Sequence, residues 1–478
     1  MGVLSAYEPK EVFKFFEDIC AIPHGSGNTK QISDYLANFA KERNLKFRQD
    51  ELGDVIIWKD GTIGYENAPT VILQGHIDMV AVKVLGCDKD METEGLDLEV
   101  NGDYLSATGT SLGGDDGIAV AYALAILDSN DIAHPPIEAV FTVDEEIGLI
   151  GADFLDCSDL KGRYMLNIDS EEEGIFIVSC AGGMNALAKL PYETEEKTGT
   201  VLSMNISGFK GGHSGAEIHT GRLNSNIALG RMLYSLKGNF QIVTVSGGEK
   251  NNAISKVSDV SLLVEDAASV QSALANKFQE IAKEYETVET GIKIQFCVEE
   301  NVTVQAMTTC STKKVIAALL DHPNGIQRMN PDMESMVQTS LNMGVVAMEE
   351  GNVVFSSAIR SSSETEKFAL LEKVQCFFDI LGGSVETSGV YPGWEYNPNS
   401  TLTDIMTEAY KEQFGKNPQV IGIHAGLECG LFASKLPGLD AVSIGPEMHD
   451  VHTTDEVLGI SSTARTWTLI KNTLAKIK

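Results

Sequence analysis

A chain of 478 residues is longer than one hydrophobic core supports, so its length predicts at least two domains. Its net charge of -32 repels phosphate and excludes nucleic acid and anionic membranes as partners. The sequence has no apolar run long enough to span a membrane, no signal-peptide pattern at its N-terminus, and no CxxC pair among its eight cysteines. We therefore expect a cytoplasmic protein with reduced thiols.

The first part of the chain has the alternating helix and strand patterns of an α/β domain. Apolar periodicity predicts helices at residues 10–22, from residue 29 and after residue 117, and strands at residues 54–58, 70–75, 136–143 and 164–168. Three of these strands run directly into polar side chains, which are His76 and Asp78, then Glu145 and Glu146, then Asp169. Open α/β sheets place their chemistry at the carboxyl ends of strands. Anions gathered there would repel one another unless cations held them.

The stretch Ser111 to Gly117, written SLGGDDG, places two aspartates among three glycines just before an apolar helical run. Glycine lets the backbone come close to a ligand. Asp115, held in this way, could give one carboxylate oxygen to each of two metal ions.

The pattern changes near residue 187 and returns after residue 394. Between these points each half reads β-α-β-β-α-β, which predicts a duplicated insertion. We therefore expect an α/β catalytic domain formed by residues 1–186 and 395–478, interrupted by an α+β domain at residues 187–394. The catalytic domain should contain a mixed, mostly parallel sheet flanked by helices.

Seven residues form one candidate site: His76, Asp78, Asp115, Glu145, Glu146, Asp169 and His452. Imidazole and carboxylate ligands without thiolates suit zinc, manganese or cobalt. Five ligands, one of them shared, would give each of two ions three protein contacts and leave a position for water. Two such ions about 3.5–4 Å apart are a recurrent arrangement for amide hydrolysis.

Six motifs occur in order along nearly the whole chain: GHIDMV, SLGGDDG, TVDEEIGLIGA, NIDSEEEG, GGHSG and EMHDVHTTDE. They resemble the motifs of the di-zinc aminoacylase/carboxypeptidase-like metallopeptidases. HAGLECG and RSSSE narrow the resemblance to the cytosolic aminoacyl-histidine dipeptidases. The resemblance implies a zinc-peptidase-like fold with an inserted lid, a centre of two divalent metal ions, most simply Zn²⁺, and hydrolysis of Xaa-His and related dipeptides.

The resemblance also assigns roles to the candidate residues. One ion would take His76, Asp115 and Asp169, and the other Asp115, Glu146 and His452. Asp78 would orient the His76 imidazole, and Glu145 would be the general base that takes a proton from a metal-bridging water. A cis peptide bond between Asp115 and Asp116 is implied as well.

In the insertion, the resemblance assigns His213 of GGHSG to stabilise the oxyanion of the tetrahedral intermediate. Arg360 and Asn252 would hold the C-terminal carboxylate of the substrate, since an arginine fork matches a carboxylate with two hydrogen bonds. Arg360 as a surface ion pair and Asn252 as a turn residue remain alternative interpretations. We expect His424 and Glu428 of HAGLECG to line the substrate pocket.

Alternatives to a dipeptidase stay open. A relative with the same chemistry would act on acyl-amino acids or tripeptides, and a catalytically silent protein would bind metal or peptide without turnover. Glu145 argues against the silent protein, because metal binding alone needs no base. A serine hydrolase built on Ser214 or on the serines around Arg360 is disfavoured because the chain has no GxSxG motif. Many relatives take a lid histidine from a second subunit, so a monomer and a homodimer both remain open.

Overall fold

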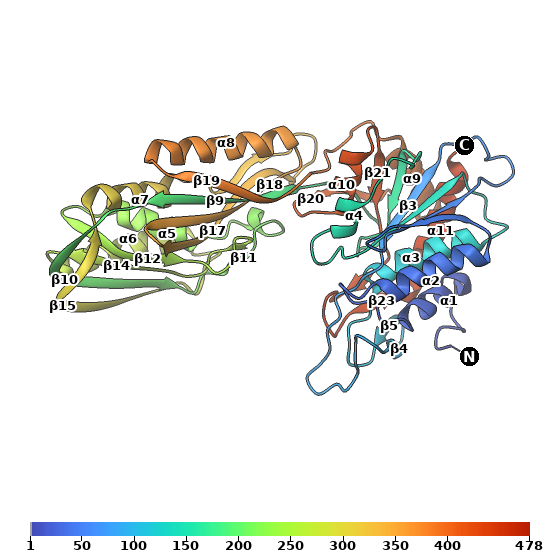
Figure 1. Cartoon of the computed structure of the whole chain (residues 1–478), viewed down its shortest axis with the longest axis horizontal. Coiled ribbons are helices and arrows are strands. Elements are labelled where there is room, and N and C mark those ends of the chain that lie inside the picture. The colour runs from blue at the N-terminus through green and yellow to red at the C-terminus, as the bar shows by residue number, and fades with distance from the viewer. Residues whose placement is uncertain (1) are drawn as a thin grey trace. The chain divides into compact units, whose positions relative to one another are not determined.

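The chain forms two structural units in the computed structural model, which describes residues 2–478. Unit 1 extends to Ser179 and resumes with Tyr396–Gly422 and Leu427–Lys478, whereas unit 2 comprises Cys180–Glu395 and Ile423–Gly426 (Figure 1). Among residues 2–478, none of the helices combines the length and the apolar character needed to cross a membrane.

Unit 1 is built on an eight-stranded sheet with the strand order β1-β2-β6-β3-β7-β21-β8-β20. Its strands are β1 (Lys46–Gln49), β2 (Val55–Lys59), β3 (Val71–His76), β6 (Ile137–Thr142), β7 (Tyr164–Asn167), β8 (Ile175–Cys180), β20 (Gln419–Ile423) and β21 (Asp440–Ser443). The strands β6, β3, β7 and β21 run parallel to one another, whereas β1 with β2, β2 with β6, and β21 with β8 pair antiparallel. The predicted mixed sheet is confirmed, and its four central strands are parallel.

Helices flank this sheet and cover it, which is why its central strands are apolar. They are α1 (Lys10–Cys20), α2 (Lys30–Glu42), α3 (Gly114–Asp128), α4 (Ile150–Phe154), α9 (Thr401–Phe414), α10 (Glu428–Lys435) and α11 (Ile460–Lys476). Every residue of β3 and β6 is buried, as expected for strands covered on both faces. The helix α3 contacts both β3 and α1 and is buried from Ile118 to Leu127, which is why its sequence is apolar on all sides (Figure 1).

A small second sheet in unit 1 was not expected from the sequence. Its order is β22-β23-β5-β4, formed by β4 (Leu98–Asn101), β5 (Tyr104–Ala107), β22 (Met448–His449) and β23 (Val457–Gly459). Strands β22 and β23 are antiparallel, and His452 lies in the connection between them. This sheet therefore fixes the position of the last predicted ligand.

Unit 2 contains a nine-stranded sheet with the order β15-β10-β14-β12-β17-β18-β9-β19, and β16 pairs with β17. The strands are β9 (Gly182–Pro191), β10 (Thr194–Ser207), β12 (Phe240–Gly247), β14 (Ser258–Val264), β15 (Lys293–Met307), β16 (Gly325–Met329), β17 (Val337–Glu349), β18 (Asn352–Ser361) and β19 (Ser384–Tyr391). A separate two-stranded ladder pairs β11 (Gly212–His213) with β13 (Ala253–Ile254).

Four helices pack with this sheet around one apolar core: α5 (Ser225–Ser235), α6 (Ala267–Glu284), α7 (Thr309–Asp321) and α8 (Glu364–Leu381). The first half has the element order β10, α5, β12, β14, α6, β15. The two strands predicted at residues 292–296 and 302–308 form the single long strand β15, which pairs with β10 along its whole length. The second half continues with α7, β17, β18, α8 and β19.

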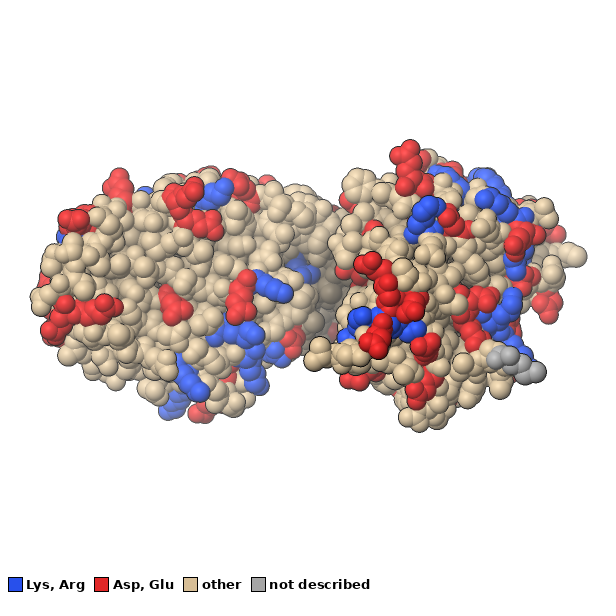
Figure 2. Space-filling model, turned by 60° about the horizontal axis from the view of Figure 1, so that its bottom comes forward, with Lys and Arg blue, Asp and Glu red and all other residues tan. Residues whose placement is uncertain are grey.

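Acidic and basic side chains are interspersed on the visible surface of each unit, as Figure 2 shows. The net charge of -32 is therefore spread over the surface on this view. A dispersed charge of this kind serves solubility.

Candidate functional site

The predicted ligands of unit 1 meet at the carboxyl ends of its parallel strands. His76 is the last residue of β3, Glu145 and Glu146 follow β6, and Asp169 follows β7. Neighbouring parallel strands end at the same edge of the sheet, so these side chains are brought together by register: His76 pairs with Thr142 at the end of β6.

Asp115 lies between two histidines from distant parts of the chain. Its Oδ1 is 2.9 Å from Nε2 of His76, and its Oδ2 is 3.1 Å from Nε2 of His452. The peptide bond between Asp115 and Asp116 is cis, as the resemblance implied. The two oxygens of one carboxylate thus face two different imidazoles.

The carboxylate of Glu146 completes a group on the His452 side. Ligand atoms of Asp115, Glu146 and His452 lie within 4.8 Å of one another. Oε1 of Glu146 forms an ion pair of 2.8 Å with Nε2 of His452, the same nitrogen that faces Asp115. A divalent cation bound here would replace the imidazole proton between these three side chains.

The His76 side of the site contains an additional aspartate. His76 Nε2 is 3.7 Å from Asp169 Oδ1, and the group of atoms within 4.8 Å comprises His76, Asp116 and Asp169. Asp116 is fully buried, and its Oδ2 accepts a hydrogen bond of 3.2 Å from the backbone N–H of His76. Burial raises the pKa of Asp116 well above its usual value, which favours the neutral acid. Through this hydrogen bond Asp116 supports the end of β3.

The site contains no basic side chain other than histidine. Within the described residues, no lysine or arginine lies within 4 Å of the carboxylates of Asp115, Glu145, Glu146 or Asp169. Burial by itself would lower the pKa of His76, but hydrogen bonds with Asp115, Asp169 and Asp78 raise that pKa well above its usual value. Imidazoles and carboxylates arranged in this way fit divalent cations, which take the place of the imidazole protons on binding.

Glu145 lies beside this ligand set. A carboxylate oxygen of Glu145 lies within 4.8 Å of ligand atoms of His76 and Glu146. Burial raises the pKa of Glu145 to about 9; the His76 charge opposes this effect, and the charge of Asp169 adds to it. With this pKa Glu145 is a neutral acid at pH 7, and positive charge placed beside it would lower the pKa toward the value that a base needs.

Asp78 holds the two glutamates through their backbone. It accepts hydrogen bonds from the N–H groups of Glu145 (3.0 Å) and Glu146 (3.3 Å), and from the hydroxyl of Ser26 (2.8 Å). Nδ1 of His76 lies 2.9 Å from the main-chain oxygen of Asp78 and 3.4 Å from its carboxylate. The nearest acceptor for the imidazole is thus the Asp78 main chain. The sequence places Ser26 in a turn but offers no sign of this contact.

Unit 2 contains a second polar cluster, centred on His213 and Arg360. Nδ1 of His213 accepts hydrogen bonds from the N–H groups of Gly215 (3.3 Å) and Ala216 (3.1 Å), so a neutral ring carries its proton on Nε2. That Nε2 lies 3.2 Å from a terminal nitrogen of Arg360. Two donors facing each other are satisfied when an acceptor binds both, and an anion suits this position.

Arg360 is 9% exposed and lies in β18, directly opposite Ser340 of β17 and Gly183 of β9. Its guanidinium donates to the hydroxyl of Tyr391 at 3.1 Å, while its Nε has no hydrogen-bond partner within residues 2–478. No carboxylate of the described chain lies within 4 Å of this guanidinium. A Cβ atom at Gly183 would lie 2.5 Å from the Tyr391 hydroxyl oxygen, so glycine makes room for the tyrosine ring.

The remaining predicted residues have different surroundings. In unit 2, His424 Nε2 lies 2.7 Å from the hydroxyl of Ser340, and burial followed by the charge of Arg360 lowers the pKa of His424 to about 3. Asn252 has an exposed side chain, and its main-chain oxygen accepts from the N–H of Ser214 at 2.8 Å. This contact places Asn252 beside the His213 turn.

Glu428 is fully buried in unit 1, where it accepts hydrogen bonds from Gln74 (2.5 Å) and Thr142 (2.8 Å). Burial raises the pKa of Glu428 to about 7. Its carboxylate is enclosed beneath the carboxyl ends of β3 and β6. This burial removes Glu428 from the side chains that we propose to touch substrate.

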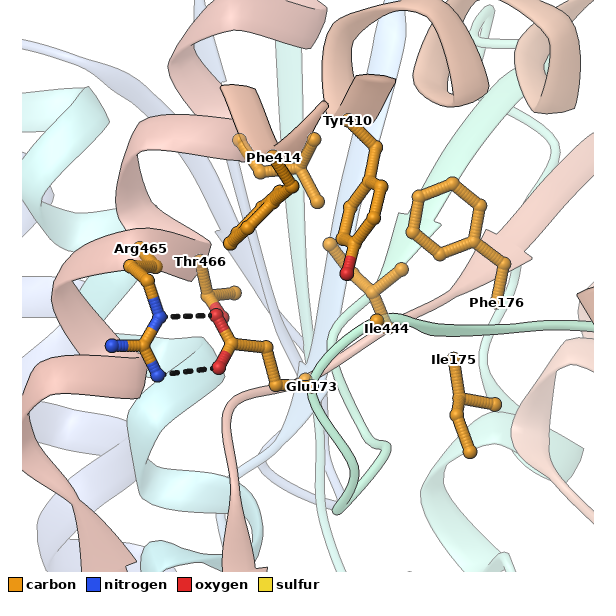
Figure 3. Close-up of a pocket in the computed structure, with 11 residues that line it drawn as sticks. Glu173, Ile175, Phe176, Tyr410, Phe414, Ile444, Arg465 and Thr466 are labelled. Atoms are coloured by element: carbon orange, nitrogen blue, oxygen red, sulfur yellow. Dashed lines mark hydrogen bonds and ion pairs between the residues drawn. The ribbon is translucent and has the colours of Figure 1, made fainter. Parts of the chain in front are cut away.

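A cavity elsewhere in unit 1 does not belong to this site. It lies beside α9 and α11, where Glu173 forms two hydrogen bonds with Arg465 of 2.6 and 2.5 Å and Tyr410 stacks on Phe414 (Figure 3). Its volume is about 10 Å³, the space of a single water molecule. None of its lining residues is a predicted ligand.

Comparisons with known proteins identify relatives of the whole chain. The model of peptidase family M20/M25/M40 matches residues 72–476. The cytosol non-specific dipeptidase of Escherichia coli K12 is 34% identical across 100% of this chain and 99% of its own length. The crystal structure of the aminoacylhistidine dipeptidase of Vibrio alginolyticus has 35% identity and a TM-score of 0.94, covering 100% of this chain and 98% of that one.

A more distant structure, the aminopeptidase PepT of Bacillus cereus, is 15% identical with a TM-score of 0.56 over 98% of this chain and 99% of that one, which shows a common fold. The predicted fold class and family resemblance are confirmed. Because the family model spans most of the chain and a relative of 34% identity matches it from end to end, the chain belongs to peptidase family M20/M25/M40.

Proposed function

We propose that the protein is a metal-dependent dipeptidase, with His76, Asp115 and Asp169 holding one divalent cation and Asp115, Glu146 and His452 the other. The observation that carries this proposal is the position of Asp115, whose two oxygens lie 2.9 and 3.1 Å from two separate imidazoles. The carboxylate of Glu146, 2.8 Å from the same His452 nitrogen, supports it. The full-length relatives that are named as dipeptidases supply the substrate class. Cations of this kind, when bound, polarise a peptide carbonyl and activate water.

The side chains of unit 1 would move the proton. Glu145 would take a proton from the attacking water and deliver it to the leaving amine. Asp78 would keep Glu145 and Glu146 in place through their backbone N–H groups. Unit 1 is then the catalytic domain, and unit 2 the inserted lid.

The cluster of unit 2 would bind the negative charges of the substrate. We propose that Arg360 binds the C-terminal carboxylate and that the Nε2–H of His213 stabilises the oxyanion. The buried guanidinium without a carboxylate partner in the described chain supports an anion here. Asn252 and His424 are proposed to border the same cluster. The name of the E. coli relative supports a cytoplasmic location.

The experiment compares metal-stripped protein with protein reloaded with Zn²⁺, Mn²⁺ or Co²⁺. Substrates are Leu-His and β-Ala-His, with acetyl-amino acids and tripeptides as the alternatives. We expect metal-restored cleavage of dipeptides in the wild type and none in Glu145→Gln. Preference for acetyl-amino acids or tripeptides would support the same-chemistry alternative. Metal binding without turnover of any substrate would support a silent binding protein.

A further inference from the structure

One buried carboxylate near the proposed metal site has no role in the reaction described above. Glu456 is 3% exposed and directly precedes β23. Its Oε2 accepts hydrogen bonds from the N–H groups of Leu112 (2.8 Å) and Gly113 (3.1 Å). Its Oε1 accepts from the N–H groups of Gly114 (2.8 Å) and Asp115 (3.5 Å).

These four donors are consecutive along the chain. Successive backbone N–H groups at the start of a helix form a concavity that binds anions. In this protein the anion is a side chain of the same molecule, so both oxygens of Glu456 hold the backbone that leads into Asp115. Gly113 has φ of 67°, the left-handed conformation that glycine adopts without strain, and this turn directs the N–H groups toward Glu456.

Glu456 also belongs to the segment that carries His452. Glu456 lies four residues after His452, in the connection between β22 and β23. It therefore joins the segment that carries His452 to the loop that carries Asp115, although these segments come from opposite ends of unit 1. Both segments supply ligands to the cation that we place between Asp115, Glu146 and His452.

We propose that Glu456 is a positioning residue that fixes Asp115 relative to His452 and thereby sets the affinity for the cation these two residues share. The inference rests on the proposed function, because it presupposes two cations. A partner that orients metal ligands commonly changes metal affinity by about 10–100-fold. The other cation is bound by Asp115 but not by His452, so the affinity for it should fall less.

Glu138 offers a matched control in the same unit. It is 2% exposed and accepts hydrogen bonds from the backbone N–H groups of Lys161 (2.9 Å) and Gly162 (2.9 Å). Its hydrogen-bond partners within residues 2–478 include no proposed metal ligand. Glu138→Gln therefore removes a similar buried carboxylate from backbone donors without touching the site.

The test is a calorimetric titration of metal-stripped wild type, Glu456→Gln and Glu138→Gln with Co²⁺, together with the melting temperature of each metal-free protein. We expect two equivalents bound by wild type and by Glu138→Gln, and a second equivalent weakened by about 10–100-fold in Glu456→Gln. The two variants should lose similar amounts of melting temperature. If Glu456→Gln does not fold, Glu456→Asp, which keeps the charge but is too short to hold both pairs of donors, should show the same selective weakening.

Three results would overturn the proposal or its basis. Wild-type affinity for both equivalents in the folded Glu456 variant means that Glu456 does not position the ligands. Equal weakening in Glu138→Gln means that any loss of a buried carboxylate lowers metal affinity. A wild-type protein that binds no Co²⁺ instead refutes the proposed metal centre itself, and with it this inference.

Discussion

Replacing Arg360 with methionine should weaken catalysis without weakening the fold. Methionine keeps most of the length of the side chain but removes the charge and the donors. Arg360 is 9% exposed, and its guanidinium contacts Tyr391 and His213 and has no carboxylate within 4 Å in the described chain. Its partner is then to be found in the substrate, which is the C-terminal carboxylate in our proposal.

The size of the effect follows from this burial. Removing one member of a buried, hydrogen-bonded charge pair costs about 2–5 kcal/mol. We expect kcat/KM for Leu-His to fall by about 30-fold to 4,000-fold in Arg360→Met, at about 1.4 kcal/mol for each factor of ten. The kcat/KM of Arg360→Lys should lie between those of wild type and Arg360→Met. Lysine keeps the positive charge, but its ammonium group cannot form the two parallel hydrogen bonds of a guanidinium.

The stability of the substrate-free protein should not fall when Arg360 is replaced. A buried cation without a counter-ion destabilises the fold, so the melting temperature of Arg360→Met should stay equal or rise. The charge of Arg360 also lowers the pKa of His213 and of His424, in each case after the larger effect of burial. Both pKa values should therefore rise in the variant, which NMR titration of the histidine ring protons can measure.

The decisive assay compares Leu-His with its C-terminal amide, which lacks the carboxylate. Wild type should cleave the amide poorly, and Arg360→Met should lose little further activity on it. An equal loss on both substrates would refute the reasoning, because the arginine would then act elsewhere than on the carboxylate.

Three further predictions concern the site in unit 1. Glu145→Gln should lower kcat by about 10²–10⁴-fold while the protein still binds two equivalents of metal, and loss of the metal along with activity would contradict the role as base. Chelation should lower the melting temperature, since uncompensated carboxylates then repel one another, and Zn²⁺ or Mn²⁺ should restore it; an unchanged melting temperature would argue against bound cations. Burial raises the pKa of Glu428 from 4.5 to about 7, so the folded metal-free protein binds an extra proton and loses stability as the pH rises through this interval. Glu428→Gln should gain up to about 3 kcal/mol in unfolding free energy relative to wild type between these pH values, measured by urea unfolding, and a difference independent of pH would contradict the assignment.

The residues that end buried strands could be predicted from the sequence because a strand pattern fixes where its last side chain lies. His76, Glu145 and Asp169 each follow an apolar run, and parallel strands bring such ends to one edge. The helices and strands of the insertion also follow from periodicity. The fusion of two predicted strands into β15 does not, since the residues between them read as a break until β10 pairs with both.

Contacts made by the backbone could not be predicted in the same way. Glu456 and Ser26 act on N–H groups and a carboxylate far away in the sequence, and any residue type presents the same N–H group. The sequence pattern also gave no sign that Glu428, expected to line the substrate pocket, is buried. It follows a polar loop in the sequence, but it begins α10 beneath the sheet, where Gln74 and Thr142 bind it.

The place of β21 in the sheet affects the order in which the protein can be completed during synthesis. This strand comes from the last segment of the chain, yet it lies between β7 and β8, which are made before the insertion. The ribosome must therefore finish all of unit 2 before the sheet of unit 1 can close, and His452 emerges later still. Unit 2 has every strand it needs while the nascent chain is still growing, so it can fold first. A message truncated after residue 435 would leave a gap inside the central sheet and no means of completing the site.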